Sequence, residues 1–223
     1  KMIDLIGDNY SLLQVMSRFG LSLGFGDKTV KEVCEMNNVD CQTFLVVVNF
    51  MAEGFSRMDG SADDISIPAL VDYLRQAHIY FLDYCLPAIR RKLIEAIDCS
   101  QDDVSFLILK FFDGYMREVR KHMEYEEKTV FKYVDTLIHG NAPKNYQIST
   151  FSKHHDQVGE RLTELKNIII KYCPAKANTN VLNAALFDIY ACEEGLESHC
   201  KVEDYLFVPA ILKLERRMRE NEK

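Results

Sequence analysis

The chain has 223 residues, of which 48% are hydrophobic and 27% are charged, and its formal net charge is −7. This length and composition are those of a globular protein that buries a core of ordinary size. The acidic balance argues against non-specific binding to nucleic acid or to an anionic membrane surface, and no apolar run approaches the roughly 20 residues that cross a bilayer. We therefore expect neither a nucleic-acid partner nor a membrane partner.

Residues 1–56 carry the periodicity of short helices. Leu12, Val15, Met16 and Phe19 recur at helical spacing, and two further short apolar runs follow the glycine-containing stretch 20–26. The polar segment from Arg57 onward contains glycine and three aspartates, which is typical of a linker. The pattern predicts a small helical N-terminal domain over 1–56 and a linker over 57–67.

Four long periodic segments follow, over about 68–97, 100–138, 145–172 and 179 to near the C-terminus. No segment shows the alternating apolar pattern of a strand. Pro87 and Pro209 lie inside the first and fourth segments, where proline kinks a helix or splits it. Long helices joined by short loops predict an all-α, up-down-up-down four-helix bundle over residues 68–217.

Seven cysteines are spread along the chain without a Cys-x-x-Cys pair. An odd number of isolated thiols suits a reducing compartment better than a disulfide framework. This usage predicts a cytoplasmic location.

Two matching motifs, His122-x-x-x-Glu126 and His199-x-x-x-Glu203, occur in the second and fourth segments. Residues four apart on a helix lie on one face, so each motif directs an imidazole and a carboxylate at the same point. His78 and His155 interrupt the apolar stripes of the other two segments. The polar side chains thus fall on the faces that should form the core.

The histidines also match in height. His78 lies about 20 residues before the first turn, and His122 lies about 20 residues after it. At a rise of ~1.5 Å per residue, the two side chains are therefore at the same height along the bundle. The same count brings His155 and His199 to one level. Four histidines and two buried glutamates in one layer predict a metal centre, most simply a dinuclear one bridged by carboxylates, with zinc or a single ion as the alternative. We expect Glu127 to be a solvated neighbour of Glu126 rather than a ligand.

These residues resemble the hemerythrin-like HHE cation-binding family, and in particular its Repair of Iron Centers (iron–sulfur cluster repair) type. The resemblance rests on Lys121–Glu127 with Val130-Phe131, on Lys153–Asp156 with Gly159-Glu160, on Glu197–Pro209, and on His78 with the following Leu86-Pro87. It covers residues 68–215. It implies a hemerythrin-like bundle with two non-haem iron ions, held by His78, His122, His155 and His199 and bridged by Glu126 and Glu203.

Two positions depart from the family pattern. The family's further ligand histidine, about 21 residues after the first, falls on Cys99 here. Either Cys99 replaces that ligand or one iron position stays open to solvent or an exogenous ligand, and we favour the open position. The family's N-terminal Cys-Cys pair is replaced by Gly24-Phe25. Roles that need this dithiol are not expected.

The resemblance implies a stress-response protein that repairs iron–sulfur clusters damaged by nitric oxide or oxidants. The partners it implies are damaged iron–sulfur proteins. Two other functions stay open: a module that senses dioxygen or nitric oxide and acts on a signalling partner, and an iron-binding or iron-storing bundle without repair activity. A homodimer is compatible with each of them.

Overall fold

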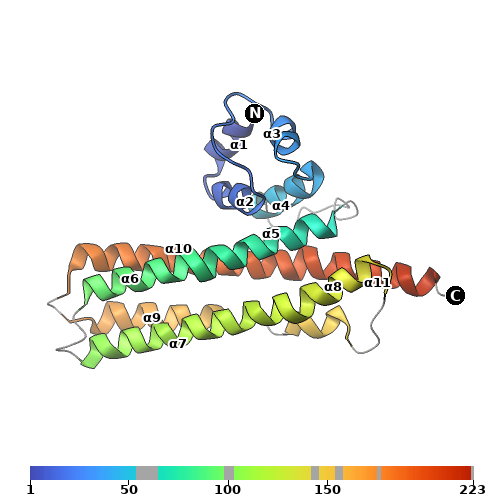
Figure 1. The fold of residues 1–223 in the computed structure, drawn as a ribbon. Coiled ribbons are helices and arrows are strands. Elements are labelled where there is room, and N and C mark those ends of the chain that lie inside the picture. Colours follow the sequence, from blue (N-terminus) through green and yellow to red (C-terminus); the bar gives the residue numbers. More distant parts are fainter. Residues whose placement is uncertain (54–64, 98–102, 142–145, 154–157, 175–176, 222–223) are drawn as a thin grey trace. The chain divides into compact units, whose positions relative to one another are not determined.

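The structure is a computed structural model that describes residues 1–53, 65–97, 103–141, 146–153, 158–174 and 177–221. In these ranges every regular element is helical, which confirms the predicted all-α fold (Figure 1). The α-helices are α1 Met2–Asp8, α2 Leu12–Arg18, α3 Val30–Met36, α4 Cys41–Glu53, α5 Ile67–Ile79, α6 Leu86–Ala96, α7 Asp103–Tyr125, α8 Phe131–Ile138, α9 Val158–Tyr172, α10 Thr179–Val202 and α11 Val208–Asn221. Four short segments of other helical type are η3 Tyr80–Cys85, η4 Glu126–Val130, η5 Ile148–Lys153 and η7 Glu203–Phe207.

Three of the four predicted long segments are continuous helical runs: α5–η3–α6, α7–η4–α8 and α10–η7–α11. The third differs, because the helix expected from about residue 145 is replaced at its start by the 3₁₀ segment η5, and α9 begins only at Val158. Ile148 and Phe151 of η5 are fully buried. The segment, which is not the expected α-helix, is therefore packed into the core through these two side chains.

Several helix ends follow from local sequence. Thr29 caps α3, since its hydroxyl accepts from the Glu32 amide while the Glu32 carboxylate accepts from the Thr29 amide. After α2, Gly20 adopts φ 73°, and the amide of Leu21 donates to the Met16 carbonyl at 2.9 Å. This left-handed termination needs a residue without a Cβ penalty, which explains the glycine.

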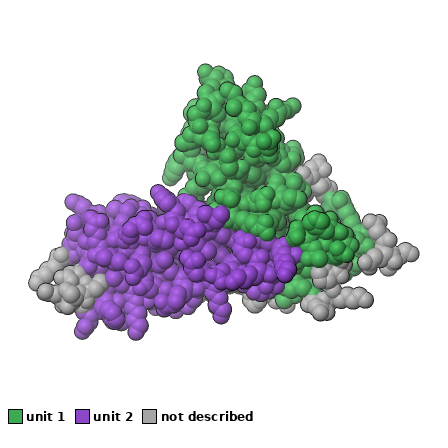
Figure 2. Space-filling view, in the orientation of Figure 1, with its two compact units in different colours: residues 1–77, 133–150, 201–223 green, residues 78–132, 151–200 purple. Residues whose placement is uncertain are grey.

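The contacts divide the chain into two compact units, coloured in Figure 2. Unit 1 comprises 1–77, 133–150 and 201–223. Within it, Phe19 of α2 packs against Phe44 of α4 and Tyr73 of α5, with ring centroids 5.4 and 4.8 Å apart. The buried Arg18 donates to the Tyr73 hydroxyl at 3.2 Å. The short N-terminal helices thus share one core with the start of α5.

Most of the linker predicted over 57–67 falls outside the described residues, so the division into 1–56, 57–67 and 68–217 stays a prediction.

A buried carboxylate organises another part of unit 1. Glu215 of α11 accepts hydrogen bonds from the Tyr133 hydroxyl at 2.6 Å and from the Ile148 amide at 3.0 Å. Both bonds are buried, and Arg219 lies 3.3 Å from the other carboxylate oxygen. This contact fixes the start of η5 to α8 and α11.

Unit 2 comprises 78–132 and 151–200, and its helices α6, α7, α9 and α10 pack side by side (Figure 1). Arg90 of α6 pairs with Asp113 of α7 through two hydrogen bonds of 2.6 and 3.1 Å. Between α6 and α10, Lys92 pairs with Asp188 at 2.6 Å and the Asn178 amide donates to the Ala96 carbonyl. Each helix buries one apolar face, and none of the described helices is both long and apolar enough to cross a membrane.

Candidate metal centre

Five of the six predicted ligands lie at the points where α-helices change into π-helical turns. His78 is the second-last residue of α5, directly before η3. His122 lies in the last turn of α7 and Glu126 begins η4, while His199 lies in the last turn of α10 and Glu203 begins η7. The four-residue spacing places each imidazole one turn from its carboxylate, as predicted.

The π-helical turns have a partial cause in the sequence. The amides of Leu86 and Val208 bond to carbonyls five residues back, and each of these residues is followed by a proline, Pro87 or Pro209. Because proline has no N–H, the regular four-residue bond is lost at these points. The third turn, η4, lacks a following proline, and the Phe131 amide bonds to the Glu126 carbonyl. Such turns are rare in proteins and are frequent at functional sites.

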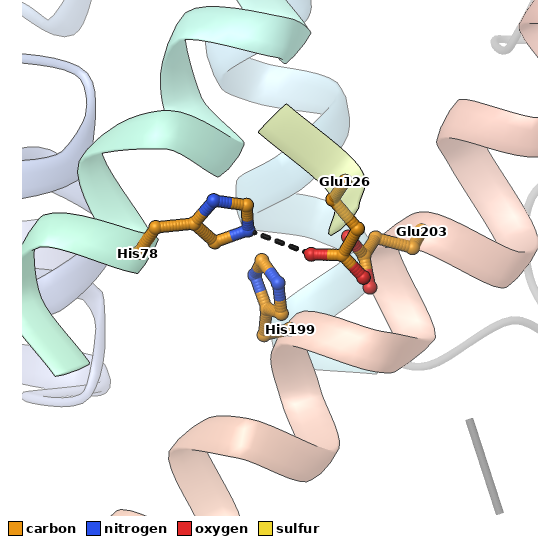
Figure 3. A group of neighbouring side chains, drawn as sticks. All are labelled: His78, Glu126, His199 and Glu203. Carbon is orange, nitrogen blue, oxygen red and sulfur yellow. Dashed lines mark ion pairs between the residues drawn. The ribbon is translucent and has the colours of Figure 1, made fainter. Parts of the chain in front are cut away.

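Four side chains form one compact group: His78, Glu126, His199 and Glu203 (Figure 3). Each offers one donor atom, and these atoms lie within 4.8 Å of one another. The exposed fraction of every one of these residues is 3% or less. The group is thus a buried set of two imidazoles and two carboxylates.

The His78 ring is held between two acidic groups. Its Nε2 lies 2.9 Å from Oε2 of Glu126, and its Nδ1 lies 2.9 Å from Oε1 of Glu127. The ring also stacks on Phe131, with centroids 5.5 Å apart, and meets the His199 ring edge-on at 5.2 Å. One nitrogen therefore faces the buried group while the other is bonded to a partly exposed carboxylate, which fixes the ring orientation.

His122 joins this arrangement through Glu126. Its Nε2 lies 2.8 Å from Oε1 of Glu126, and its side chain is 15% exposed. It stands beside the four-residue group rather than within it. The last predicted ligand, His155, lies outside the described residues, as does Cys99.

The electrostatics of Glu126 reflect this surrounding. Burial opposes ionisation of its carboxyl group, but hydrogen bonds to His122 and His78 outweigh burial and hold its pKa below the usual value. Glu126 is therefore a carboxylate at neutral pH. A buried carboxylate needs nearby positive charge, which imidazolium or a metal ion can supply.

The donor set fits a metal ion. Imidazole nitrogen suits iron, zinc and copper, and carboxylate oxygen both bonds to a metal and neutralises its charge. The Nδ1 bond from His78 to Glu127 is the outer contact commonly made by a metal-ligating histidine. His78, Glu126, His199 and Glu203 would hold the ion, with His122 next to them.

Sequence reasoning missed the role of Glu127, which was expected to be a solvated neighbour of Glu126. It is partly exposed, but it bonds to His78. No periodicity marks such a contact, since Glu127 lies next to Glu126 in sequence and its partner comes from another helix. By contrast, His139 is exposed, as its position outside the apolar stripe suggests.

The chain matches the family model described as the hemerythrin HHE cation-binding domain over residues 69–211. This range covers well over half of the chain and contains all six predicted ligands. The chain therefore belongs to the hemerythrin HHE cation-binding family, and it is a metal-binding helical module of the hemerythrin type. A search of curated proteins gave no significant match.

Proposed function

We propose that the protein holds a non-haem di-iron centre and acts in the repair of iron centres, in particular iron–sulfur clusters, damaged by nitrosative or oxidative stress. The observation that carries the di-iron part is the environment of Glu126. Its two carboxylate oxygens face two different imidazoles, Oε2 facing His78 at 2.9 Å and Oε1 facing His122 at 2.8 Å.

These distances suit neighbouring ligands of one ion. Two donor atoms bound at about 2.1 Å and at right angles lie about 3 Å apart. His78 with one oxygen of Glu126 would thus serve one ion, and His122 with the other oxygen would serve a second. Glu126 would bridge the two. Glu203, which lies in the group with Glu126 and His199, supplies a second carboxylate for the pair.

Bound iron would supply redox chemistry and a coordination position for small ligands such as dioxygen or nitric oxide. The protein's own residues bury the site and orient its imidazoles. Zinc is the alternative metal, because the same donors bind it. The proposed clients are damaged iron–sulfur proteins. A cytoplasmic setting forms part of the proposal and is supported by the six described cysteines, which are thiols and not disulfides.

One observation favours a second candidate, a gas-sensing or iron-binding module without repair activity. The position of the family's N-terminal Cys-Cys pair holds Gly24, whose φ is 87°. Side chains rarely tolerate this conformation, so this loop is built for glycine rather than for a vicinal dithiol. A function that depends on that dithiol is therefore disfavoured, and a signalling partner would take the place of a repair client.

Anaerobic reconstitution with ferrous iron tests these proposals. Metal analysis is expected to give about two irons per chain, and oxidation is expected to produce a near-ultraviolet absorption that zinc would not give. Restoration of a nitric-oxide-damaged cluster enzyme by the loaded protein would support repair. Reversible gas binding without restoration would support sensing, and no metal uptake would overturn both.

A further inference from the structure

A second polar layer lies in unit 2, seven residues from the metal ligands on three helices. Cys192 precedes His199 by seven residues on α10, and Tyr115 precedes His122 by seven on α7. Seven residues are two turns of an α-helix, so each pair shares a face, about 10 Å apart. Cys85 follows His78 by seven residues, across η3.

From each of the three histidines, the seven residues lead toward the same end of the bundle. From His78 toward Cys85 the chain runs toward the end of α6, and from His199 back to Cys192 it runs toward the start of α10. These two ends meet, because the Asn178 amide donates to the Ala96 carbonyl at 2.8 Å. From His122 back to Tyr115 the chain runs toward the start of α7, which packs beside α6. Cys85, Tyr115 and Cys192 therefore belong to one layer.

The two thiols of this layer lie on neighbouring stretches of helix, because Lys92, seven residues after Cys85, pairs at 2.6 Å with Asp188, four residues before Cys192. Cys85 is 7% exposed and Cys192 is 2% exposed. A hydrogen bond between their thiols, together with burial, raises the pKa of Cys192 well above its usual value. Cys192 is thus protonated at neutral pH, and burial shields both thiols from reagents in solution, which react with the thiolate.

Tyr115 shows that the layer is more than apolar packing. Its side chain is 1% exposed, and within the described part of the chain its hydroxyl has no hydrogen-bond partner. Burial, and then the neighbouring thiols of Cys192 and Cys200, raise its pKa. A phenylalanine would fill the same space without the cost of burying a hydroxyl. Within the described residues, this layer thus holds a buried hydroxyl donor without an acceptor.

We propose that Cys85 and Cys192 form an internal dithiol that reduces the oxidised metal centre in the neighbouring ligand layer and closes to a disulfide. This inference rests on the proposed di-iron centre. Two S–H bonds break and one S–S bond forms. Two electrons convert two ferric ions to ferrous ions, and the two protons pass to water. Tyr115 donates its hydrogen bond to the thiolate that forms during the reaction.

The test uses the full chain loaded anaerobically with ferrous iron and oxidised with one hydrogen peroxide per two irons. The protein is then incubated without added reductant, quenched with N-ethylmaleimide in denaturant at about pH 7, and mapped by mass spectrometry without reduction. We expect a Cys85–Cys192 crosslink to accumulate as the near-ultraviolet absorption of the oxidised centre fades. In C192A and in C85A, iron uptake should persist and fading should be at least about tenfold slower.

Three further samples sharpen the result. The matched control C34A/C41A, which alters two thiols of the N-terminal helices, should behave as the unaltered chain. Y115F should keep its thermal stability and close the disulfide about tenfold more slowly, because a hydrogen bond to the charged intermediate is lost. Metal-free protein given the same peroxide should form no crosslink.

The outcomes separate the two proposals. Failure to take up iron overturns the di-iron proposal and this inference with it. Iron that binds and oxidises while Cys85 and Cys192 both remain alkylatable in the unaltered chain overturns the dithiol alone. Equal crosslinking in metal-free protein also overturns it, because the electron acceptor would then lie outside the metal layer.

Discussion

Nδ1 of His78 lies 2.9 Å from Oε1 of Glu127, so a predicted metal ligand is oriented by the residue that directly follows another predicted ligand, Glu126. The bond leaves Nε2 of His78 directed at the buried group. An acidic partner on the outer nitrogen also makes the imidazole a stronger ligand. Glu127 therefore contributes to the site without joining it.

Replacement of Glu127 by alanine is expected to lower metal affinity by about 10- to 100-fold, because His78 loses its orienting acceptor. Glu127→Gln should retain part of the affinity, since its amide oxygen can still accept from Nδ1. Competition with a chelator of known affinity measures the change. Glu124→Ala is the control, because Glu124 is one turn away on the solvated side and pairs with Lys128. Equal affinity in the Glu127 and Glu124 variants would contradict this role.

Metal is expected to stabilise the protein through the buried donor group. At a free metal concentration 100 times the Kd, the expected gain is about 2.7 kcal/mol, and a chelator should reverse it. Glu203→Gln should abolish most of this gain, since it removes a charged donor. The melting temperature with and without metal measures the effect. Glu194→Gln changes an exposed residue of α10 and should leave the metal-dependent stabilisation intact. If this variant also lost the stabilisation, the effect would come from the protein's overall charge and not from the donor group.

The contact between Tyr133 and Glu215 is expected to matter for stability and not for metal binding. Tyr133→Phe removes a buried 2.6 Å hydrogen bond to a carboxylate and should lower the free energy of unfolding by about 1–3 kcal/mol. Urea denaturation measures this change. Tyr172→Phe, at an exposed position, should have no effect. A Tyr133→Phe protein as stable as the unaltered chain would show that the bond contributes nothing net.

Stability should decline at alkaline pH because of buried thiols. Burial, and then the neighbouring Cys41, raise the pKa of Cys34 to about 12 from an ordinary value of 9.0. The unfolded chain releases this proton near pH 9 while the folded chain keeps it, so the free energy of unfolding falls as pH rises between these values. Urea unfolding under reducing conditions measures the slope. Cys34→Ala should make it shallower, and an unchanged slope would exclude Cys34 as the cause.

The sequence allowed the helices and the local pairing of ligands to be predicted, because both depend on short-range periodicity. His199 and Glu203 lie on one face for the same reason that the flanking Leu196 and Leu206 are buried with them. The hemerythrin family assignment made from these motifs is confirmed by the match over residues 69–211. The ligand set itself, including His155, stays a prediction.

The π-helical turns could not be predicted, although Pro87 and Pro209 marked two disturbed helices. A pattern based on 3.6 residues per turn contains no signal for one extra residue in a turn. The third turn, η4, begins at Glu126 and has no proline directly after it. The bond between His78 and Glu127 was equally hidden, because it joins two helices whose relative rotation is set by packing.

The π-helical turns also constrain any attempt to transfer the site to another scaffold. Each adds one residue to a helix, which rotates everything after it by about 100° relative to a regular α-helix. If His-x-x-x-Glu is copied onto an idealised bundle, the histidine and the glutamate still share one helix face. The apolar residues after the glutamate, however, no longer face the core, because the extra residue is missing. The portable unit is therefore the motif together with the widened turn that follows it.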